Sequence, residues 1–293
     1  MPVCVTDIPR IDPELMQQYQ SQEVATVHES QGRIGLLAPY MRPIFRPARI
    51  AGSAVTVEVA PGDNWMLHVA VEQCQPGDIL VVAQKIVSKA EGRLVALSEV
   101  TVSAEAKALA AQADKDPRLA QLILDESKAV LRVKPGVIVV EHRLGTILAN
   151  AGIDGSNIAA TDSVDQVLLW PVDPDASAEA LSKALSAHWG IDLPVIINDS
   201  IGRAWRMGTV GHAIGCYGID PLWNQVGDLD LFDKPLRVTE VASADAIAAA
   251  ACLVQGEGRE GTPVVWVRGC PAKFEKPRGA NALLRRSEQD MFR

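Results

Sequence analysis

Two short apolar runs, Ile79–Ala83 and Leu193–Ile197, most constrain what this chain of 293 residues can fold into. Each run is five residues long, carries no charge and precedes a polar segment, which indicates a buried strand. Amphipathic or alanine-rich stretches elsewhere predict helices. Strands and helices therefore mix along the chain, and we expect an α/β (α+β mixed) fold. The remaining predicted strands are 48–60, 136–141 and 263–268, and the predicted helices are 12–30, 65–72, 104–113, 119–130, 177–189 and 242–254.

Composition and charge exclude several classes of protein. Hydrophobic residues make up 48% and charged residues 22% of the chain, a globular balance that excludes a disordered, collagen-like or coiled-coil protein. The formal net charge of −8 disfavours a nucleic-acid partner. No apolar run approaches the roughly 20 residues that cross a bilayer, and the N-terminus lacks the pattern of a signal peptide. The absence of such a run also leads us to expect no membrane partner. The five cysteines form no C-x-x-C pair, so we expect a cytoplasmic protein without disulfides or a zinc site.

The segment after the first apolar run carries three cations. Lys85, Lys89 and Arg93 recur at four-residue intervals, behind Gln84. At the carboxyl end of a strand, where ligands often bind, these cations could hold phosphate oxygens. The same spacing is typical of a solvated helix face, which the residues alone favour.

A second segment, Asn150–Asn157, has the composition of a tight turn. Two glycines flank Asp154, and Asn157 follows three residues later. Such a turn can direct a carboxylate and an amide at one point. A plain Asx-rich turn without a function explains the pattern equally well.

The segment after the second apolar run is the richest in functional side chains. Asp199 and Ser200 come first, and they offer hard oxygen ligands that suit Mg²⁺ or Mn²⁺. Arg203 and Arg206 follow, and their guanidinium groups can hold phosphate or carboxylate oxygens in a bidentate manner. The glycines among and after them permit close approach of the backbone. So many polar residues at a strand end favour a site over a structural role.

A glycine-rich loop, Gln255–Gly261, follows the predicted helix at 242–254. Gly256, Glu257 and Gly258 at its start can wrap a nucleotide phosphate or bind a metal ion. Considered alone, the loop is better explained as a glycine C-cap. Taken together, the four segments supply dispersed carboxylates and cations, which suit a metal–polyphosphate site better than acyl hydrolysis.

From about residue 77 to the C-terminus the chain resembles the coenzyme F420-0:L-glutamate ligase family, also called F420 gamma-glutamyl ligases. The matching stretches occur in the family's order. They are Gly77–Arg93, Lys115–Arg118, Asn150–Asn157, Asp173–Asp175, Asp199–Gly215, Gly256–Gly258 and Ser287–Arg293. The resemblance implies the fold of that family and a homodimer.

The same resemblance implies an activity. Members of the family join L-glutamate to the lactyl carboxylate of F420-0, using GTP and a divalent cation, Mg²⁺ or Mn²⁺, and K⁺ is a further candidate cofactor. The carboxylate is first phosphorylated, and the glutamate amine then attacks the acyl phosphate. Phosphoryl transfer requires positioning and charge neutralisation, and the residue types above supply both.

Carried onto this sequence, the family's site comprises metal ligands and nucleotide contacts, and the arginines are added from their own chemistry. The resemblance implies one metal bound by Asp154 and Asp199, and a second metal contacted by Ser200 and Glu257. The nucleotide contacts fall on Gln84, Lys85, Lys89, Asn157, Gln255, Gly256 and Gly258. Arg203 and Arg206 are assigned catalytic roles, because they can hold the anionic oxygens of the reactants.

The first 83 residues resemble a different family, the 4-carboxy-4-hydroxy-2-oxoadipate aldolases of the RraA-like fold. The matching stretches are Ala25–Ile44, Ile50–Val57, Pro61–Met66 and His68–Gln75. We therefore expect a truncated aldolase-like segment at 1–76 and a ligase domain at 77–293. The Arg-Asp pair of the aldolases has no counterpart in this sequence. Two alternatives to the ligase stay open: a metal-dependent protein related to the 4-carboxy-4-hydroxy-2-oxoadipate/4-hydroxy-4-methyl-2-oxoglutarate aldolases, and a catalytically impaired hybrid.

Overall fold

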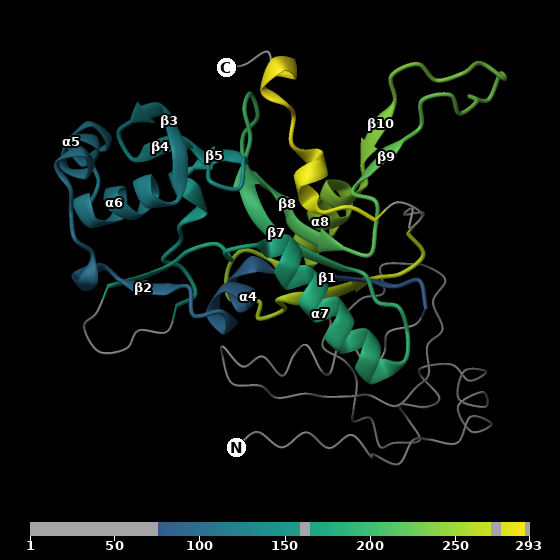
Figure 1. Ribbon diagram of the computed structural model, residues 1–293, viewed down its shortest axis with the longest axis horizontal. Coiled ribbons are helices and arrows are strands. Elements are labelled where there is room, and N and C mark those ends of the chain that lie inside the picture. Colours follow the sequence, from purple (N-terminus) through teal and green to yellow (C-terminus); the bar gives the residue numbers. More distant parts are fainter. Residues whose placement is uncertain (1–75, 159–164, 271–276, 291–293) are drawn as a thin grey trace, which may run out of the picture. The chain divides into compact units, whose positions relative to one another are not determined.

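The computed structural model describes residues 76–158, 165–270 and 277–290 (Figure 1). The chain divides into two units, Met1–Ala60 and Pro61–Arg293, and all described residues belong to the second. The elements predicted at 12–30, 48–60 and 65–72 lie outside the described residues. The aldolase-like segment lies outside them up to residue 75, and the domain boundary after residue 76 stays a prediction.

A four-stranded mixed sheet forms the centre of the described unit. Its strands run in the order β11–β1–β7–β8, with bounds β1 Ile79–Ala83, β7 Val195–Gly202, β8 Thr209–Tyr217 and β11 Val264–Val267. Strands β1 and β7 are parallel, whereas β11 and β8 pair antiparallel to them at the two edges. The two apolar runs, Ile79–Ala83 and Leu193–Ile197, therefore lie side by side in the middle of the sheet. Both runs end at the same end of the sheet.

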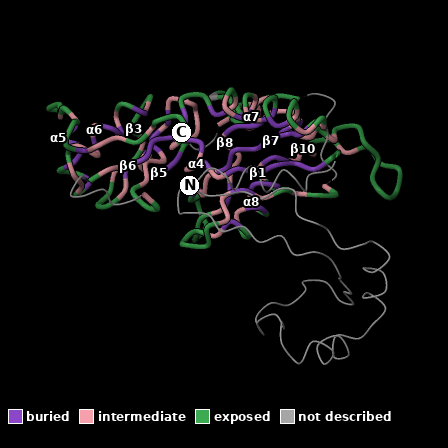
Figure 2. The backbone as a smooth tube through the Cα atoms, turned by 90° about the horizontal axis from the view of Figure 1, so that it is seen from below, coloured by how far each residue is buried: buried purple, intermediate pink, exposed green. Residues whose placement is uncertain are grey.

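Two helices cover the two faces of this sheet, α7 (Pro174–Trp189) and α8 (Ser243–Gln255). Leu80 packs in one core cluster with residues of α7, whereas its neighbour Ile79 packs in a second cluster with residues of α8. Figure 2 shows β1 and β7 buried between the two helices. Because both faces are covered, the strands are apolar at consecutive positions rather than at alternate ones.

Helix α7 begins three residues before its predicted start at residue 177. The carboxylate of Asp173 accepts a hydrogen bond from the backbone N–H of Ala176 over 3.0 Å, and Pro174 occupies the first turn. Both features favour a helix N-terminus. The helix ends where Gly190 adopts φ +68°, a left-handed conformation typical of a C-terminal glycine.

Strand β8 was not predicted from the sequence. Glycines at 211 and 215 weaken its strand pattern, yet the packing requires them. A Cβ atom at Gly211 would lie 2.4 Å from the carbonyl oxygen of Ala248, and one at Gly215 would lie 2.3 Å from that of Pro174. The glycines therefore allow α8 and α7 to approach the two faces of β8. Pairing with β8 also extends β7 beyond its predicted end at residue 197.

A second sheet packs against two helices in its own core. Its antiparallel strands are β3 (Ser127–Lys134), β4 (Val137–His142) and β5 (Ile147–Ala149), and the helices are α5 (Ala104–Ala113) and α6 (Pro117–Asp125). We call residues 97–153 the insert lobe. The helix predicted at 119–130 is wrong after residue 125, because Ser127–Val130 pair with β4 instead. The predictions of α5 and β4 are confirmed.

The remaining elements connect these two parts. Helix α4 (Gln84–Ala90) follows β1 directly, β2 (Leu94–Ala96) pairs with β6 (Gln166–Leu168), and β9 (Leu222–Asn224) pairs with β10 (Glu240–Ala242). Short 3₁₀ turns lie at Leu97–Glu99, Asn150–Gly152, Ala280–Leu283 and Ser287–Gln289. The predicted mixed α/β class is confirmed. Within the described ranges, no helix has the length and apolar character to span a membrane.

Candidate functional site

The candidate site lies at the end of the central sheet where β1 stops and β7 continues into its polar residues. Ala83, the last residue of β1, pairs in register with Asn198 of β7. Gln84 then starts α4, whereas Asp199 stays in β7, where it pairs with His212 of β8. The turn that carries Asp154 forms two backbone hydrogen bonds with Leu168 of β6, of 3.2 and 2.8 Å, and a contact with Lys85 brings it to the start of α4. The fold therefore gathers three of the four segments that the sequence singled out.

Lys85 and Asp154 form an ion pair at this edge. Asp154 also accepts hydrogen bonds from the backbone N–H of Ser156 (2.7 Å) and from its hydroxyl (2.9 Å). Burial raises the pKa of Asp154, but the bonds from Lys85 and Ser156 outweigh it, so the pKa lies below its ordinary value. The carboxylate of Asp154 is therefore charged at neutral pH.

Asp199 lies close enough to this pair to feel both charges. Its Oδ2 accepts a hydrogen bond of 2.7 Å from Nε1 of Trp170, and its Oδ1 accepts one of 2.9 Å from the backbone N–H of Ser200. Removal from water raises the pKa of Asp199 to about 6, while the bond from Trp170 and the charge of Lys85 act in the opposite direction. The negative charge of Asp154 adds to the increase. Two carboxylates thus share the field of one ammonium group.

Ser200 and Glu257 form a second polar pair beside Asp199. The hydroxyl of Ser200 donates to Oε2 of Glu257 over 2.8 Å, and the thiol of Cys252 lies 3.4 Å from Oε1. Burial, together with the adjacent Glu257 carboxylate, raises the pKa of Cys252 to about 11, so the thiol stays protonated and can donate. The glycine-rich loop is thereby tied to the end of β7.

A third connection joins α4, the Asp154 turn and the glycine-rich loop. Nζ of Lys89 donates to the carbonyl oxygen of Asn157 over 2.6 Å, and Nδ2 of Asn157 donates to the carbonyl oxygen of Gly258 over 3.1 Å. Burial lowers the pKa of Lys89, and the nearby charge of Lys85 lowers it further. The structure thus brings the predicted nucleotide-contact residues of three separate segments together.

The two predicted glutamine contacts are buried. Gln84 donates to the hydroxyl of Ser88 (2.6 Å) and to the carbonyl oxygen of Leu169 (3.3 Å). Gln255 accepts from Nδ2 of Asn198 (2.7 Å) and donates to the carbonyl oxygen of Pro263 (3.2 Å). Both amides hold backbone segments around the site, and their contact with a nucleotide stays a prediction.

Gly256 permits the turn that starts the glycine-rich loop. It adopts φ +71°, and a Cβ atom there would lie 2.3 Å from Cδ of Glu260. The carboxylate of Glu260 folds back and accepts a hydrogen bond of 2.8 Å from the backbone N–H of Gly258. A larger residue at 256 would push the Glu260 side chain away from the backbone N–H of Gly258.

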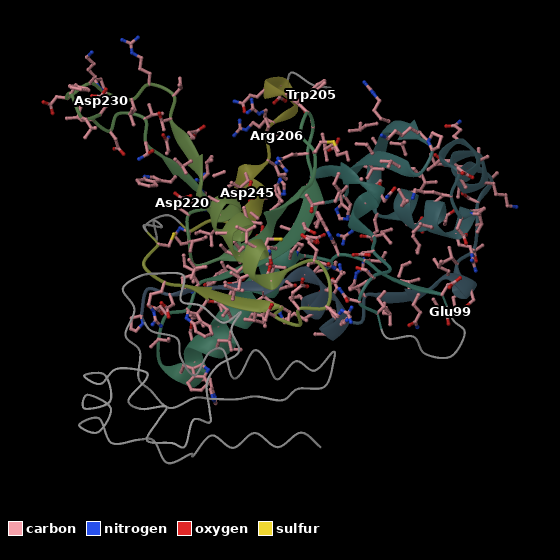
Figure 3. All side chains as sticks on the ribbon, turned by 180° about the vertical axis from the view of Figure 1, so that it is seen from behind. Glu99, Trp205, Arg206, Asp220, Asp230 and Asp245 are labelled. Atoms are coloured by element: carbon pink, nitrogen blue, oxygen red, sulfur yellow. The ribbon has the colours of Figure 1, made fainter. Side chains whose placement is uncertain are left out.

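Arg203 and Arg206 lie on the exposed loop that joins β7 to β8. Figure 3 shows Arg206 next to Trp205 at the end of this hairpin. Nη1 of Arg203 lies 3.4 Å from the carbonyl oxygen of Gly208, and both guanidinium groups remain exposed to solvent. The catalytic roles assigned to the two arginines stay predictions.

The four predicted metal ligands fall into two pairs rather than one cluster. Asp154 and Asp199 flank Lys85, whereas Ser200 and Glu257 bond to each other. Across the described residues, no three or more His, Cys, Asp and Glu side chains come together in a group that could hold a metal ion. Carboxylate and hydroxyl oxygens are nevertheless the donor types that Mg²⁺ and Mn²⁺ prefer. The metal assignment stays a prediction.

Sequence reasoning missed Trp170 and the network behind it. Arg93 lies beyond the end of α4, where Nε donates to the carbonyl oxygen of Trp170 and Nη2 to Oε1 of Glu126, both over 2.8 Å. It is therefore engaged inside the protein and does not continue the row of Lys85 and Lys89. No sequence signal could reveal these contacts, because their partners lie far apart in the chain.

Comparisons with known proteins agree with the residues gathered here. The model of the F420-0:Gamma-glutamyl ligase family matches residues 56–269. The coenzyme F420:L-glutamate ligase of Methanopyrus kandleri is 42% identical over 240 residues, which cover 80% of this chain and 94% of that protein. The one from Methanothermobacter thermautotrophicus is 45% identical over 225 residues, 76% of this chain and 87% of that protein.

Both comparisons bear on the ligase resemblance, and the aldolase resemblance of the first 83 residues stays a prediction. The family match spans well over half of the chain and includes every predicted site residue. The chain belongs to the F420-0:gamma-glutamyl ligase family.

Proposed function

We propose that the protein joins L-glutamate to the lactyl carboxylate of coenzyme F420-0, with GTP as the phosphoryl donor. The observation that carries this proposal is the convergence of Lys85, Asp154 and Asp199 at one sheet edge. Charges of both signs at one point suit a reaction that transfers a phosphoryl group between anionic reactants. The names of the relatives, coenzyme F420:L-glutamate ligase, supply the acceptor and the amino acid.

In this proposal Asp154 and Asp199 hold one divalent cation, and Ser200 and Glu257 contact a second. Their oxygens fit Mg²⁺ or Mn²⁺ by donor type. A bound divalent cation would neutralise phosphate charge and polarise the transferred group. K⁺ is proposed as an additional cofactor on the family resemblance alone.

The chain's own cations then bind the nucleotide. Lys85 and Lys89, on one face of α4, are proposed to contact triphosphate oxygens, and Asn157 and the glycine-rich loop are proposed as further nucleotide contacts, because Asn157 bonds to both Lys89 and Gly258. Phosphorylation of the acceptor carboxylate gives an acyl phosphate and GDP. Attack by the glutamate amine then forms the amide bond and releases phosphate. Arg203 and Arg206 at the hairpin tip are proposed to hold anionic groups of the reactants.

The proposed assembly is a homodimer. Residues 225–239 form an arm between β9 and β10 that extends away from the central sheet (Figure 1). Leu231 is 98% exposed and Phe232 is 79% exposed on this arm. Large apolar side chains exposed together mark interaction sites in soluble proteins. A second copy of this chain is the proposed partner of the arm.

A direct assay tests the proposed reaction. Purified protein is incubated with GTP, Mn²⁺ or Mg²⁺, K⁺, L-glutamate and F420-0, and the products are measured by mass spectrometry. We expect F420-1 and GDP from the wild-type protein and neither product from Asp154→Asn or Asp199→Asn. Lys183→Met, which removes an exposed ion pair on α7, is the matched control and should keep full activity. GDP release that is unchanged in both aspartate variants would contradict the proposal, as would a folded wild-type protein that forms no F420-1.

A further inference from the structure

We propose that Trp170 is a positioning residue that orients both aspartates of the site. Its indole N–H directs the carboxylate of Asp199, and its ring sets the turn that carries Asp154. The inference rests on the proposed function only where it assigns a divalent cation to these aspartates. The contacts themselves are properties of the fold.

The bond to Asp199 is buried and has a fixed direction. Trp170 is 1% exposed, and Nε1 lies 2.7 Å from Oδ2 of Asp199. An indole nitrogen can only donate, so the donor and acceptor cannot exchange roles. Because Oδ1 is directed by the backbone N–H of Ser200, both oxygens of Asp199 are held in one orientation. Such preorganisation is what a metal-binding carboxylate needs.

The same indole touches the turn that precedes Asp154. A Cβ atom at Gly152 would lie 2.5 Å from Nε1 and 2.6 Å from Cε2 of Trp170, so only glycine allows this approach. Gly152 also adopts φ +68°, which disfavours other residues. Two residues earlier than the indole, Leu168 bonds to the backbone of Asp154 in both directions. One short segment, Leu168–Trp170, therefore bonds to the backbone of Asp154 and to the carboxylate of Asp199.

The ring and the backbone of Trp170 are held by further contacts. The ring of His142 packs against it with centroids 4.9 Å apart, and Nε of Arg93 donates to the carbonyl oxygen of Trp170 over 2.8 Å. Arg143 donates to the next two carbonyl oxygens, at 3.1 and 2.7 Å. Glu126 joins the two arginines through bonds of 2.8 and 2.9 Å. A ring held on its face and at its backbone cannot turn its N–H away from Asp199.

Removal of the donor should therefore weaken cation binding without removing a ligand. Partners that orient metal ligands typically contribute roughly 10- to 100-fold in affinity or activity. Trp170→Phe keeps an aromatic ring in the cavity and lacks the N–H. Trp189→Phe is the matched control, because Trp189 packs against the α7 side of the central core and its buried Nε1 has no hydrogen-bond partner.

The test measures Mn²⁺ affinity without nucleotide, by calorimetry and by electron paramagnetic resonance. We expect the dissociation constant of Trp170→Phe to rise by roughly tenfold or more, and that of Trp189→Phe to stay within about twofold of wild type. With turnover, kcat should fall more than the KM for glutamate changes. An equal affinity in wild type and Trp170→Phe would overturn the role of Trp170 alone. A wild-type protein that binds no Mn²⁺ would overturn the metal assignment as well.

A second measurement keeps the native tryptophan. In ¹⁵N-labelled protein, the indole N–H resonance of Trp170, assigned in the spectra of the wild-type protein, should move when Asp199 is changed to Asn, because its acceptor loses charge. The resonance that is absent from Trp189→Phe should stay in place. An indole signal of Trp170 that ignores Asp199→Asn would overturn the inference even if Trp170→Phe failed to fold.

Discussion

The hydroxyl of Ser200 donates a hydrogen bond of 2.8 Å to the carboxylate of Glu257, joining the end of β7 to the loop that follows α8. The two residues lie 57 positions apart in the sequence, so only the fold brings them together. β7 is fixed in the central sheet, and the loop is held to it by this bond and to the Asp154 turn by the bond from Asn157 to Gly258. The pair is thus the point at which the nucleotide-contact loop is tied to the predicted metal ligands.

The first prediction concerns Glu257. Glu257→Gln keeps the size of the side chain and its acceptor for Ser200 but removes the charge. We expect GTP turnover to fall by roughly tenfold or more, because a neutral amide is a weaker ligand for a divalent cation. Glu240→Gln, at the exposed first residue of β10, is the control and should turn over GTP at the wild-type rate. Initial rates of GDP release measure both, and equal rates would contradict the assignment of Glu257.

The second prediction concerns Lys85. Lys85→Met removes the ion pair with Asp154 and a donor for phosphate oxygens while keeping the apolar stem. Hydrogen bonds to charged groups contribute about 1.5–3 kcal/mol, so the KM for GTP should rise by roughly 10- to 100-fold. Nucleotide titration of the purified variant measures this. A GTP affinity equal to that of Lys183→Met would show that Lys85 serves only Asp154.

The third prediction is a pH dependence of stability at Glu126. Burial raises the pKa of Glu126, but its bonds with His142, Arg143 and Arg93 lower it to about 2, from an ordinary value of 4.5. A depressed carboxylate pKa stabilises the fold above the unfolded-state value, and this contribution is lost as pH falls through the folded value. The stabilisation should therefore be complete above about pH 4.5 and disappear towards pH 2.

Denaturant unfolding of the wild-type protein and Glu126→Gln between pH 2 and 7 tests this directly. The difference in the free energy of unfolding should be about 2–3 kcal/mol at neutral pH and should shrink as the pH falls. Glu288→Gln, on an exposed turn, is the control and should show no such difference. A gap between wild type and Glu126→Gln that is constant with pH would contradict the prediction.

The fourth prediction concerns the glycines of the β7–β8 hairpin. A Cβ atom at Gly215 would overlap the backbone of Pro174, which cannot move without shifting the start of α7. Gly215→Ala should lower the free energy of unfolding by about 1–3 kcal/mol. Gly202→Ala is the matched control, because a Cβ atom there meets nothing within 4 Å. Equal midpoints of thermal unfolding for the two variants would show that α7 adjusts freely.

The fifth prediction concerns the arm. The double variant Leu231→Ser, Phe232→Ser removes two large apolar side chains that are exposed next to each other on the arm. If the arm contacts a second copy, light scattering after size-exclusion chromatography should give twice the chain mass for wild type and a monomer for the variant. The variant should unfold cooperatively as a monomer. A wild-type protein that is monomeric at all concentrations tested would contradict the homodimer.

The sequence predicted the elements that have a strong local pattern. Strand β1 and helices α5, α7 and α8 show it, because burial on two faces or on one helical stripe leaves a readable periodicity. Strand β8 could not be predicted, because its glycines are required by the close approach of α7 and α8 and do not form a strand pattern in the sequence. The helix predicted at 119–130 failed at Ser127, where pairing with β4 overrides the local helix pattern.

The candidate site divides in the same way. Asp154 and Asp199 follow from motifs at turn and strand ends, where the sequence is locally informative. Trp170 and Arg93 do not, because their roles depend on partners that come together only in three dimensions. Arg93 shows the limit most clearly: its four-residue spacing from Lys89 indicates one shared helix face, yet α4 ends at Ala90.

The chain leaves the central sheet after α4, forms the insert lobe and returns to the sheet at Trp170, where Leu148 of the lobe, Trp170 and Ile201 of β7 share one core cluster. The site therefore draws on two cores, because the turn with Asp154 follows the lobe's last strand while Asp199 belongs to the sheet. Regions of a protein can open separately while the rest stays folded. Opening of the lobe would disperse the reactive groups even in a molecule whose sheet is intact, so catalytic competence reports on the integrity of the lobe.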